Sequence, residues 1–149
     1  MSSLRDLYQE IILDHGRRPR NFGRLAQADR SAEGFNPLCG DRLTLYLRMA
    51  GDVIAAAGFE GAGCAISTAS ASLMTEALKG KTTAEAEALF ADFRALVTAT
   101  TDAPAAAALG KLAVLGGVRA FPARVKCATL AWHTMHAALH AENKTVSTE

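Results

Sequence analysis

The strict alternation of apolar and polar residues from Arg42 to Met49 is the feature that most constrains the fold. Side chains of a strand point alternately to its two faces, so this pattern predicts a strand with one buried face. The buried set is Leu43, Leu45, Leu47 and Met49. Turn residues Gly51 and Asp52 follow, and a second apolar segment covers 53–59, so we expect a hairpin.

Helical periodicity dominates the rest of the chain and predicts five helices. The expected ranges are Ser3 to Gly16, Ala65 to Leu78, Thr82 to Val97, Asp102 to Gly116 and Pro122 to Ala141. Thr82 and Glu85 have the spacing of a capping box at the third of these. Residues 17–38 are rich in Gly, Pro, Asn and Arg and are expected to form a long loop, and residues 143–149 a loose tail. The fold class is therefore α+β.

Length and composition indicate one domain over residues 1–149, since half of the 149 residues are hydrophobic and 21% are charged. The 16 Lys and Arg residues nearly balance the 15 Asp and Glu residues, so nucleic acid is not an expected partner. The longest apolar run, Ala105 to Val118, is interrupted by Lys111 and three glycines, so we expect no membrane span. The first residues lack the apolar core of a signal peptide, and we expect a cytoplasmic protein.

The three cysteines are the main candidates for chemistry. Cys39 lies in an Asn-Pro-Leu-Cys-Gly-Asp turn, Cys64 begins a predicted helix after a glycine-rich turn, and Cys127 lies near the start of the last helix. An odd number of scattered cysteines does not suit a disulfide framework. Three thiolates and the carboxylate of Asp41 match the tetrahedral donor set of zinc. The spacing contains no CxxC pair, so buried thiols acting as small apolar residues are the alternative.

The histidines are weaker candidates for metal binding. His136 and His140 have the four-residue spacing of a metal pair, and His133 lies on the same predicted helix. None of the three shares the helix face of Cys127, so we expect a solvent-facing polar edge. His15 is expected to interact with the negative end of the first helix.

A basic cluster follows the first predicted helix and consists of Arg17, Arg18, Arg20 and Arg24. We expect a solvated loop here. Docking of an acidic patch on a partner protein is the alternative.

Four segments occur in order along the chain: Leu7 to His15 with Pro19 to Asn21, then Asn36 to Asp41, Gly61 to Ser67, and Pro122 to Trp132. Together they resemble the U-type iron-sulfur cluster assembly proteins, and within that family the SufU branch. IscU-type members carry a His immediately before the third Cys and a shorter segment between the second and third. Here Lys126 takes that position, and the region from Thr82 to Gly117 looks enlarged. The resemblance implies a small antiparallel sheet of about three strands packed against about five helices.

By the same resemblance, Cys39, Asp41, Cys64 and Cys127 bind one zinc ion, and the protein accepts persulfide sulfur from a SufS-type cysteine desulfurase for iron-sulfur cluster assembly. Pyridoxal phosphate and cleavage of the C–S bond belong to that partner. The resemblance assigns Cys39 as the thiolate that is freed to attack the outer sulfur of the persulfide, and gives Arg124 a supporting electrostatic role. Donor chemistry alone also allows Asp41 to leave, because a hard carboxylate is the poorest match to zinc among thiolates.

Two alternatives use the same residues. The first is a scaffold that assembles a [2Fe-2S] cluster and transfers it, which metal identity would distinguish. The second is a structural zinc site, for which loss of Cys39 would reduce stability and activity in parallel. A zinc hydrolase is disfavoured, because four protein ligands leave no open position for water.

Overall fold

The computed structural model describes residues 4–37, 40–98, 110–140 and 146–147. The sheet contains three antiparallel strands, β1 (Arg30–Asn36), β2 (Asp41–Ala50) and β3 (Val53–Ala62), in the order β3-β2-β1. This confirms the predicted small sheet and the hairpin of β2 and β3. A two-residue strand, β4 (Val146–Ser147), pairs in parallel with β1, within the segment that was expected to be a loose tail.

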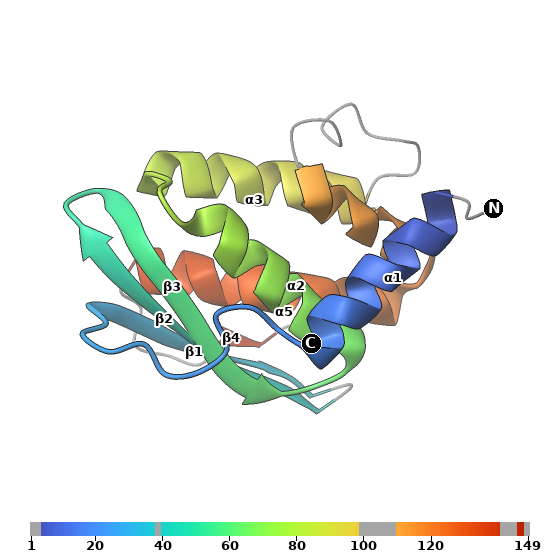
Figure 1. The fold of residues 1–149 in the computed structure, drawn as a ribbon, viewed down its shortest axis with the longest axis horizontal. Helices are drawn as coiled ribbons and strands as arrows, with labels where there is room; N and C mark the ends of the chain where they lie inside the picture. Colours follow the sequence, from blue (N-terminus) through green and yellow to red (C-terminus); the bar gives the residue numbers. More distant parts are fainter. Residues whose placement is uncertain (1–3, 38–39, 99–109, 141–145, 148–149) are drawn as a thin grey trace.

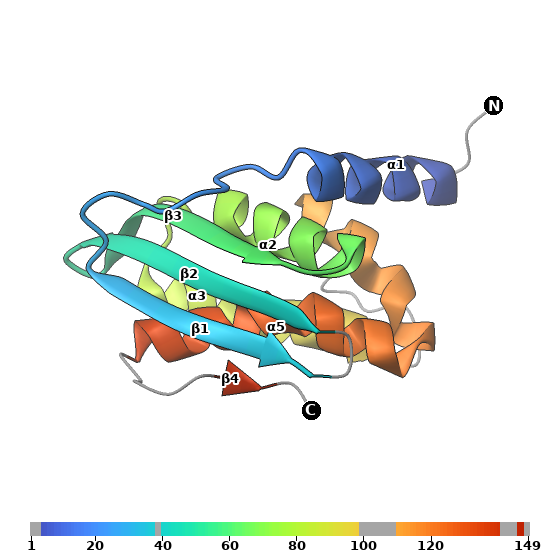
Figure 2. The same cartoon turned by 90° about the horizontal axis from the view of Figure 1, so that it is seen from below.

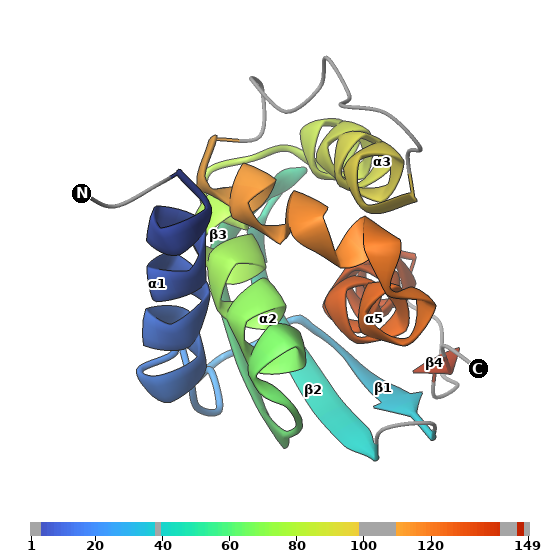
Figure 3. The same cartoon turned by 90° about the vertical axis from the view of Figure 1, so that its right-hand side faces the viewer.

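Five helices accompany the sheet in the part of the chain that the structure describes. They are α1 (Leu4–Arg17), α2 (Ala65–Leu78), α3 (Thr83–Thr98), the 3₁₀ helix η1 (Gly110–Ala120) and α5 (Pro122–Leu139). α2 and α5 lie side by side on one face of the sheet, α1 lies beside α2, and α3 and η1 form an outer layer (Figures 1, 2 and 3). The α+β class and the α2, α3 and α5 ranges are confirmed within a few residues.

The expected helix from Asp102 to Gly116 is only partly testable, because residues 99–109 lie outside the described part of the chain. The remainder is the 3₁₀ helix η1, which extends past Gly116 to Ala120.

No described helix combines the length and the apolar composition needed to cross a membrane.

The core lies between the sheet and the two central helices. Leu45 and Leu47 of β2 are fully buried, as the alternation predicted. Trp132 of α5 is also fully buried, and its ring stacks on Phe93 of α3 with 4.6 Å between ring centroids. Its indole N–H donates to Ser70 Oγ of α2 at 3.2 Å, so the polar atom of this large side chain is paired. α5 is therefore the central helix, enclosed by the sheet on one side and by helices on the other.

Strand β1 was not predicted, because it lies within the expected loop over 17–38. Its inward-facing residues are Ala32, Gly34 and Asn36, all buried, whereas Ser31 and Glu33 between them are exposed. The strand alternates in burial, but its inward side chains are small or polar, so hydrophobic periodicity does not show it. Small residues are needed here because α5 packs closely against β1.

The capping box at α3 is confirmed. The backbone N–H of Glu85 donates to Thr82 Oγ1 at 3.1 Å, and the backbone N–H of Thr82 donates to Glu85 Oε1 at 3.0 Å. These bonds satisfy two donors and lower the pKa of Glu85. They fix the start of α3.

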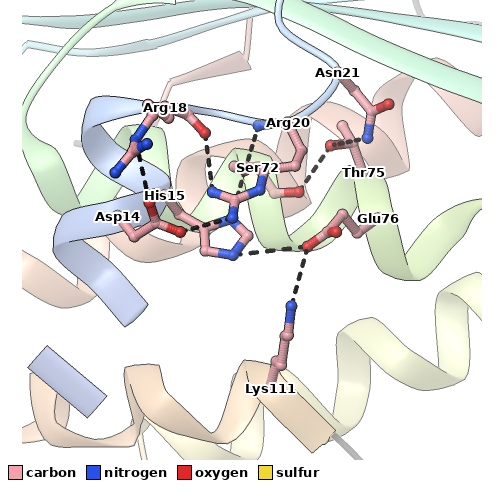
Figure 4. A network of polar contacts seen from close by, with 9 residues as sticks. All are labelled: Asp14, His15, Arg18, Arg20, Asn21, Ser72, Thr75, Glu76 and Lys111. Carbon is pink, nitrogen blue, oxygen red and sulfur yellow. Dashed lines mark hydrogen bonds and ion pairs between the residues drawn. The ribbon is translucent and has the colours of Figure 1, made fainter. Parts of the chain in front are cut away.

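A polar network joins α1 and the segment after it to α2 (Figure 4). His15 lies in the last turn of α1, as expected, but it is buried, with Nδ1 2.7 Å from Ser72 Oγ. Ser72 Oγ also accepts from the backbone N–H of Arg20 at 2.8 Å. Burial, followed by the positive charge of Arg20, lowers the pKa of His15. His15 is therefore a buried hydrogen-bonding partner of α2 rather than a charge at the end of α1.

Two arginines of the predicted basic loop are part of this network. Arg20 Nη2 lies 2.6 Å from Asp14 Oδ2, and Arg18 Nε lies 3.5 Å from Asp14 Oδ1. The hydrogen bond from Arg20 is the main cause of the lowered pKa of Asp14. Both side chains therefore contact Asp14 of α1, and the link from this segment to α2 is the backbone N–H of Arg20.

We expect Gly34→Ala to reduce the free energy of unfolding by about 1 to 3 kcal/mol, because overpacked cores lose stability on this scale. A Cβ at Gly34 would overlap Thr134 Oγ1 and lie 3.0 Å from Leu130 Cδ1. Glu33→Ala, at an exposed position of the same strand, is the control. Chemical denaturation measures the difference, and a smaller loss in a Thr134→Ala background would identify the contact responsible. Equal effects of Gly34→Ala and Glu33→Ala would contradict this account.

Stability should fall as the pH drops through and below the ordinary His value of 6.5. The pKa of His15 is lower in the folded state, so the unfolded chain binds this proton more readily and acid favours unfolding. His15→Gln should make this pH dependence less steep in denaturation curves, and His133, whose pKa burial also lowers, accounts for the remainder. Thr75→Val, which removes a hydroxyl of the same network but no titrating group, should lower stability at every pH and keep the slope. A His15→Gln variant with the original slope would refute the assignment.

Candidate metal centre

The last residue of β1 and the first residue of β2 place a buried carboxylate on the side of the sheet that the helices cover. Asn36 and Asp41 are register partners, and both are fully buried. Gly40 precedes Asp41 with φ of +72°, a conformation that glycine adopts without a side-chain penalty. Its backbone N–H donates to the carbonyl of Asn36 at 2.8 Å. This bond and the strand register bring the two polar side chains together.

Three neighbours orient the carboxylate of Asp41. Oδ1 accepts from the backbone N–H of Cys64 at 2.9 Å, and Oδ2 accepts from Asn36 Nδ2 at 3.3 Å. A Cβ at Gly63 would lie 2.7 Å from Oδ1, so a residue without a side chain is needed at that position. The carboxylate is fixed before any ion binds.

Cys64 is the N-cap of α2 and has an extended backbone, with φ of −70° and ψ of 168°. Its Sγ accepts from the backbone N–H of Ser67 at 3.4 Å. This N–H is one of the donors that a helix start leaves without a backbone partner, and it suits a negatively charged sulfur. Cys64 is exposed, so this part of the site faces solvent.

Cys127 lies on α5, which begins with Pro122, and it is buried with 2% of its surface exposed. Asn36 Nδ2 is 3.5 Å from Cys127 Sγ. The same amide therefore contacts both a carboxylate and a sulfur of the site. Sequence reasoning gave Asn36 and Gly63 no role, although both lie within the cysteine-bearing segments.

The donor atoms of Asp41, Cys64 and Cys127 all lie within 4.8 Å of one another. Ligand atoms of a tetrahedral zinc site with thiolate bonds lie about 3.8 Å apart, so small side-chain movements would close this arrangement on an ion. Two sulfurs and one carboxylate suit zinc, and thiolates also ligate iron-sulfur clusters. The structure thus brings together three of the four predicted ligands. The fourth, Cys39, lies outside the described residues.

Arg124 lies on the exposed first turn of α5. Its guanidinium lies over the ring of Phe121, 4.4 Å from the centroid. This contact is a cation–π interaction between two exposed side chains. The supporting role expected for Arg124 stays a prediction.

The histidines of α5 divide into two environments. His133 packs edge-on against Phe90 at 5.2 Å, and burial lowers its pKa. His136 and His140 both contact Glu87 of α3. The sequence predicted only a polar edge here, because nothing in it places Glu87 beside these histidines.

Comparison with known proteins gives one family over most of the chain. The profile of the NifU-like N-terminal domain matches residues 7–145. The zinc-dependent sulfurtransferase SufU of Bacillus subtilis is 41% identical over 134 residues, covering 90% of each chain. The iron-sulfur cluster assembly scaffold protein IscU of Streptococcus pyogenes is 40% identical over 139 residues, covering 93% of this chain and 86% of its own. The crystal structure of FiSufU from Fervidobacterium islandicum, at 35% identity, superposes with a TM-score of 0.82 over 92% of this chain and 99% of its own.

We expect Gly63→Ala to lower zinc affinity by about tenfold or more, as is typical when groups that orient metal ligands are changed. The added methyl would displace Asp41 Oδ1. Competition with a chromophoric chelator measures the affinity, and circular dichroism checks the fold. Ala62→Ser, which adds one heavy atom at the exposed neighbouring position, is the matched control. Equal zinc affinities for the two variants would show that Gly63 does not position the carboxylate.

Proposed function

The chain belongs to the NifU-like N-terminal domain family, the U-type proteins of iron-sulfur cluster assembly, and on that premise we propose that it is a zinc-dependent sulfurtransferase. It would accept persulfide sulfur from a SufS-type cysteine desulfurase and deliver it to the downstream assembly machinery. The observation that carries the proposal is the convergence of Asp41, Cys64 and Cys127. Similarity to the Bacillus subtilis sulfurtransferase supports zinc as the metal.

The proposed ligands are Cys39, Asp41, Cys64 and Cys127. Bound zinc would keep the cysteine sulfurs as thiolates near neutral pH. Cys39 is two residues from Asp41 in the sequence, so the chain itself limits the distance between them. Four protein ligands leave no position for a reactive water, which argues for transfer rather than hydrolysis.

The exposure of the site suits an acceptor that meets a second protein. Asp41 and Cys127 are buried, whereas Cys64 is exposed, and so are Pro37 and Gly40 on either side of residues 38–39. The buried pair would hold the metal from below. The exposed side would admit the desulfurase persulfide.

The transfer step assigned to Cys39 is a thiol–disulfide type exchange. The Cys39 thiolate attacks the outer sulfur of the partner's persulfide and forms a new S–S bond. The S–S bond within that persulfide breaks, and the partner's cysteine leaves as a thiolate. The transferred sulfur keeps its oxidation level, so no external oxidant or reductant is needed.

Arg124 is proposed to support this step electrostatically. It lies three residues before Cys127, which places it one turn earlier on α5, and it is exposed. A guanidinium at the surface near the site would attract an anionic persulfide. Lys126, immediately before Cys127, adds a second positive charge.

A second candidate function is a scaffold that assembles a [2Fe-2S] cluster on the same four residues. The observation in its favour is the 40% identity to the Streptococcus pyogenes scaffold, which nearly equals that to the sulfurtransferase. Cysteine thiolates are the usual ligands of such clusters. Lys126 favours the transfer function, because IscU-type proteins carry a His immediately before the third Cys and this chain carries a Lys there.

The test is the metal content of the purified protein together with sulfide release from free cysteine by the cognate desulfurase. We expect about one zinc per chain, as for a four-ligand site, and faster sulfide release when the protein is present. Cys39→Ala should abolish the stimulation while circular dichroism shows an intact fold. Arg124→Ala should reduce the stimulation and keep the zinc, and Arg94→Ala, an exposed charge on α3, is its control.

Other outcomes would identify the alternatives. If the purified protein contains iron in a coloured cluster that can be transferred to apo-proteins, and if it does not stimulate sulfide release, the scaffold function replaces the transfer function. Parallel loss of folding and stimulation in Cys39→Ala would indicate a structural zinc site.

A further inference from the structure

A second group of metal-binding side chains lies at the C-terminal end of α5. His136 and His140 of α5 and Glu87 of α3 each offer a donor atom, and these atoms lie within 4.8 Å of one another. Two imidazoles and one carboxylate form a donor set that first-row transition metals favour. The sequence alone showed only the two histidines.

The contacts within this cluster are close. His136 Nδ1 lies 2.9 Å from Glu87 Oε2 and 3.0 Å from Oε1. His140 Nε2 lies 3.5 Å from Glu87 Oε1, and the two imidazole centroids are 4.3 Å apart. One carboxylate therefore already faces a nitrogen of each ring.

The fold fixes where these side chains come from. His136 and His140 are four residues apart and share one face of α5, and His140 is the C-cap of that helix. The capping box of Thr82 and Glu85 sets the start of α3, which carries Glu87. The His136 ring also contacts Phe90, one turn beyond Glu87, with 6.3 Å between centroids. The two backbones are therefore held in place before an ion binds.

We propose that Glu87, His136 and His140 bind a divalent first-row transition metal ion, with Zn²⁺ as the simplest case. Three protein ligands leave at least one coordination position open, as in sites that accept water or a further ligand. Glu87 and His140 line a surface hollow of about 470 Å³, into which that position can open. Asp52 and Arg30 line the same hollow, so a second carboxylate and one positive charge are also near.

This site is separate from the cysteine site. His136 lies nine positions after Cys127 on α5, which corresponds to about 14 Å along a helix axis. One ion cannot bridge that distance, so the two sites would load independently. The proposal does not rest on the proposed sulfur transfer.

The alternative occupant of the cluster is a proton. A protonated His136 or His140 would form an ion pair with Glu87, and its ring would be held without any metal. Metal and proton compete for the same nitrogens, so the experiment must detect the ion at the rings themselves.

The test is a Zn²⁺ titration of the full chain, in which the ring ¹H–¹⁵N NMR signals of its four histidines are monitored. We expect the signals of His136 and His140 to shift in a saturable manner, and those of His15 and His133 to keep their positions. Glu87→Gln and His140→Gln should each weaken this binding by about tenfold or more. His133→Gln, one turn before His136, is the matched control and should leave it unchanged.

The cysteine site is monitored in the same variants by the thiolate-to-metal absorption of added Co²⁺. That signal should survive in Glu87→Gln and His140→Gln, which also shows that the variants fold. The proposal fails if zinc produces no saturable shift of the His136 and His140 rings, or if the shift survives both substitutions. Absence of the cobalt–thiolate signal in the unaltered protein would contradict the cysteine site and would leave the histidine site unaffected.

Discussion

The close packing of α5 against β1 is the contact on which the rest of the structure depends. Gly34 faces Thr134 and Leu130 of α5 with no room for a side chain. Because the helix lies so near the sheet, Cys127 Sγ comes within 3.5 Å of the Asn36 amide at the end of β1. The same amide donates to Asp41, so the position of the helix and the geometry of the candidate metal centre are set together.

The candidate metal centre combines a rigid half with an accessible half. Asp41 is oriented by backbone and side-chain donors and by the absence of a side chain at Gly63, and Cys127 is fixed by its buried helix. Cys64, at the exposed start of α2, belongs to the accessible half. Such an arrangement lets one face of a bound ion meet another protein while the other face stays in place, which suits both sulfur transfer and cluster assembly.

Two polar clusters away from this centre connect helices in addition to their contacts in the core. His15 and Ser72 join α1 to α2, with Arg20 bonded to both Ser72 and Asp14 (Figure 4). The first of the four family-like segments therefore has a structural role, since it supplies Asp14 and His15. At the other end of the molecule, Glu87 joins α3 to the last turn of α5 through two histidines.

The sequence by itself determined the elements whose signals are local, namely the buried leucines of β2, the capping box of α3 and the α+β class, and it marked the cysteines and Asp41 as candidate metal donors. It did not reveal β1, because the inward residues of that strand are small or polar and leave no hydrophobic period. Only the tertiary structure decided which donors meet. Asp41, Cys64 and Cys127 are far apart in the sequence, and Glu87 is separated from His136 by 49 positions. Periodicity in the sequence shows which nearby residues share a face of one helix or strand. Which side chains from distant parts of the chain come together depends on how the helices pack on the sheet.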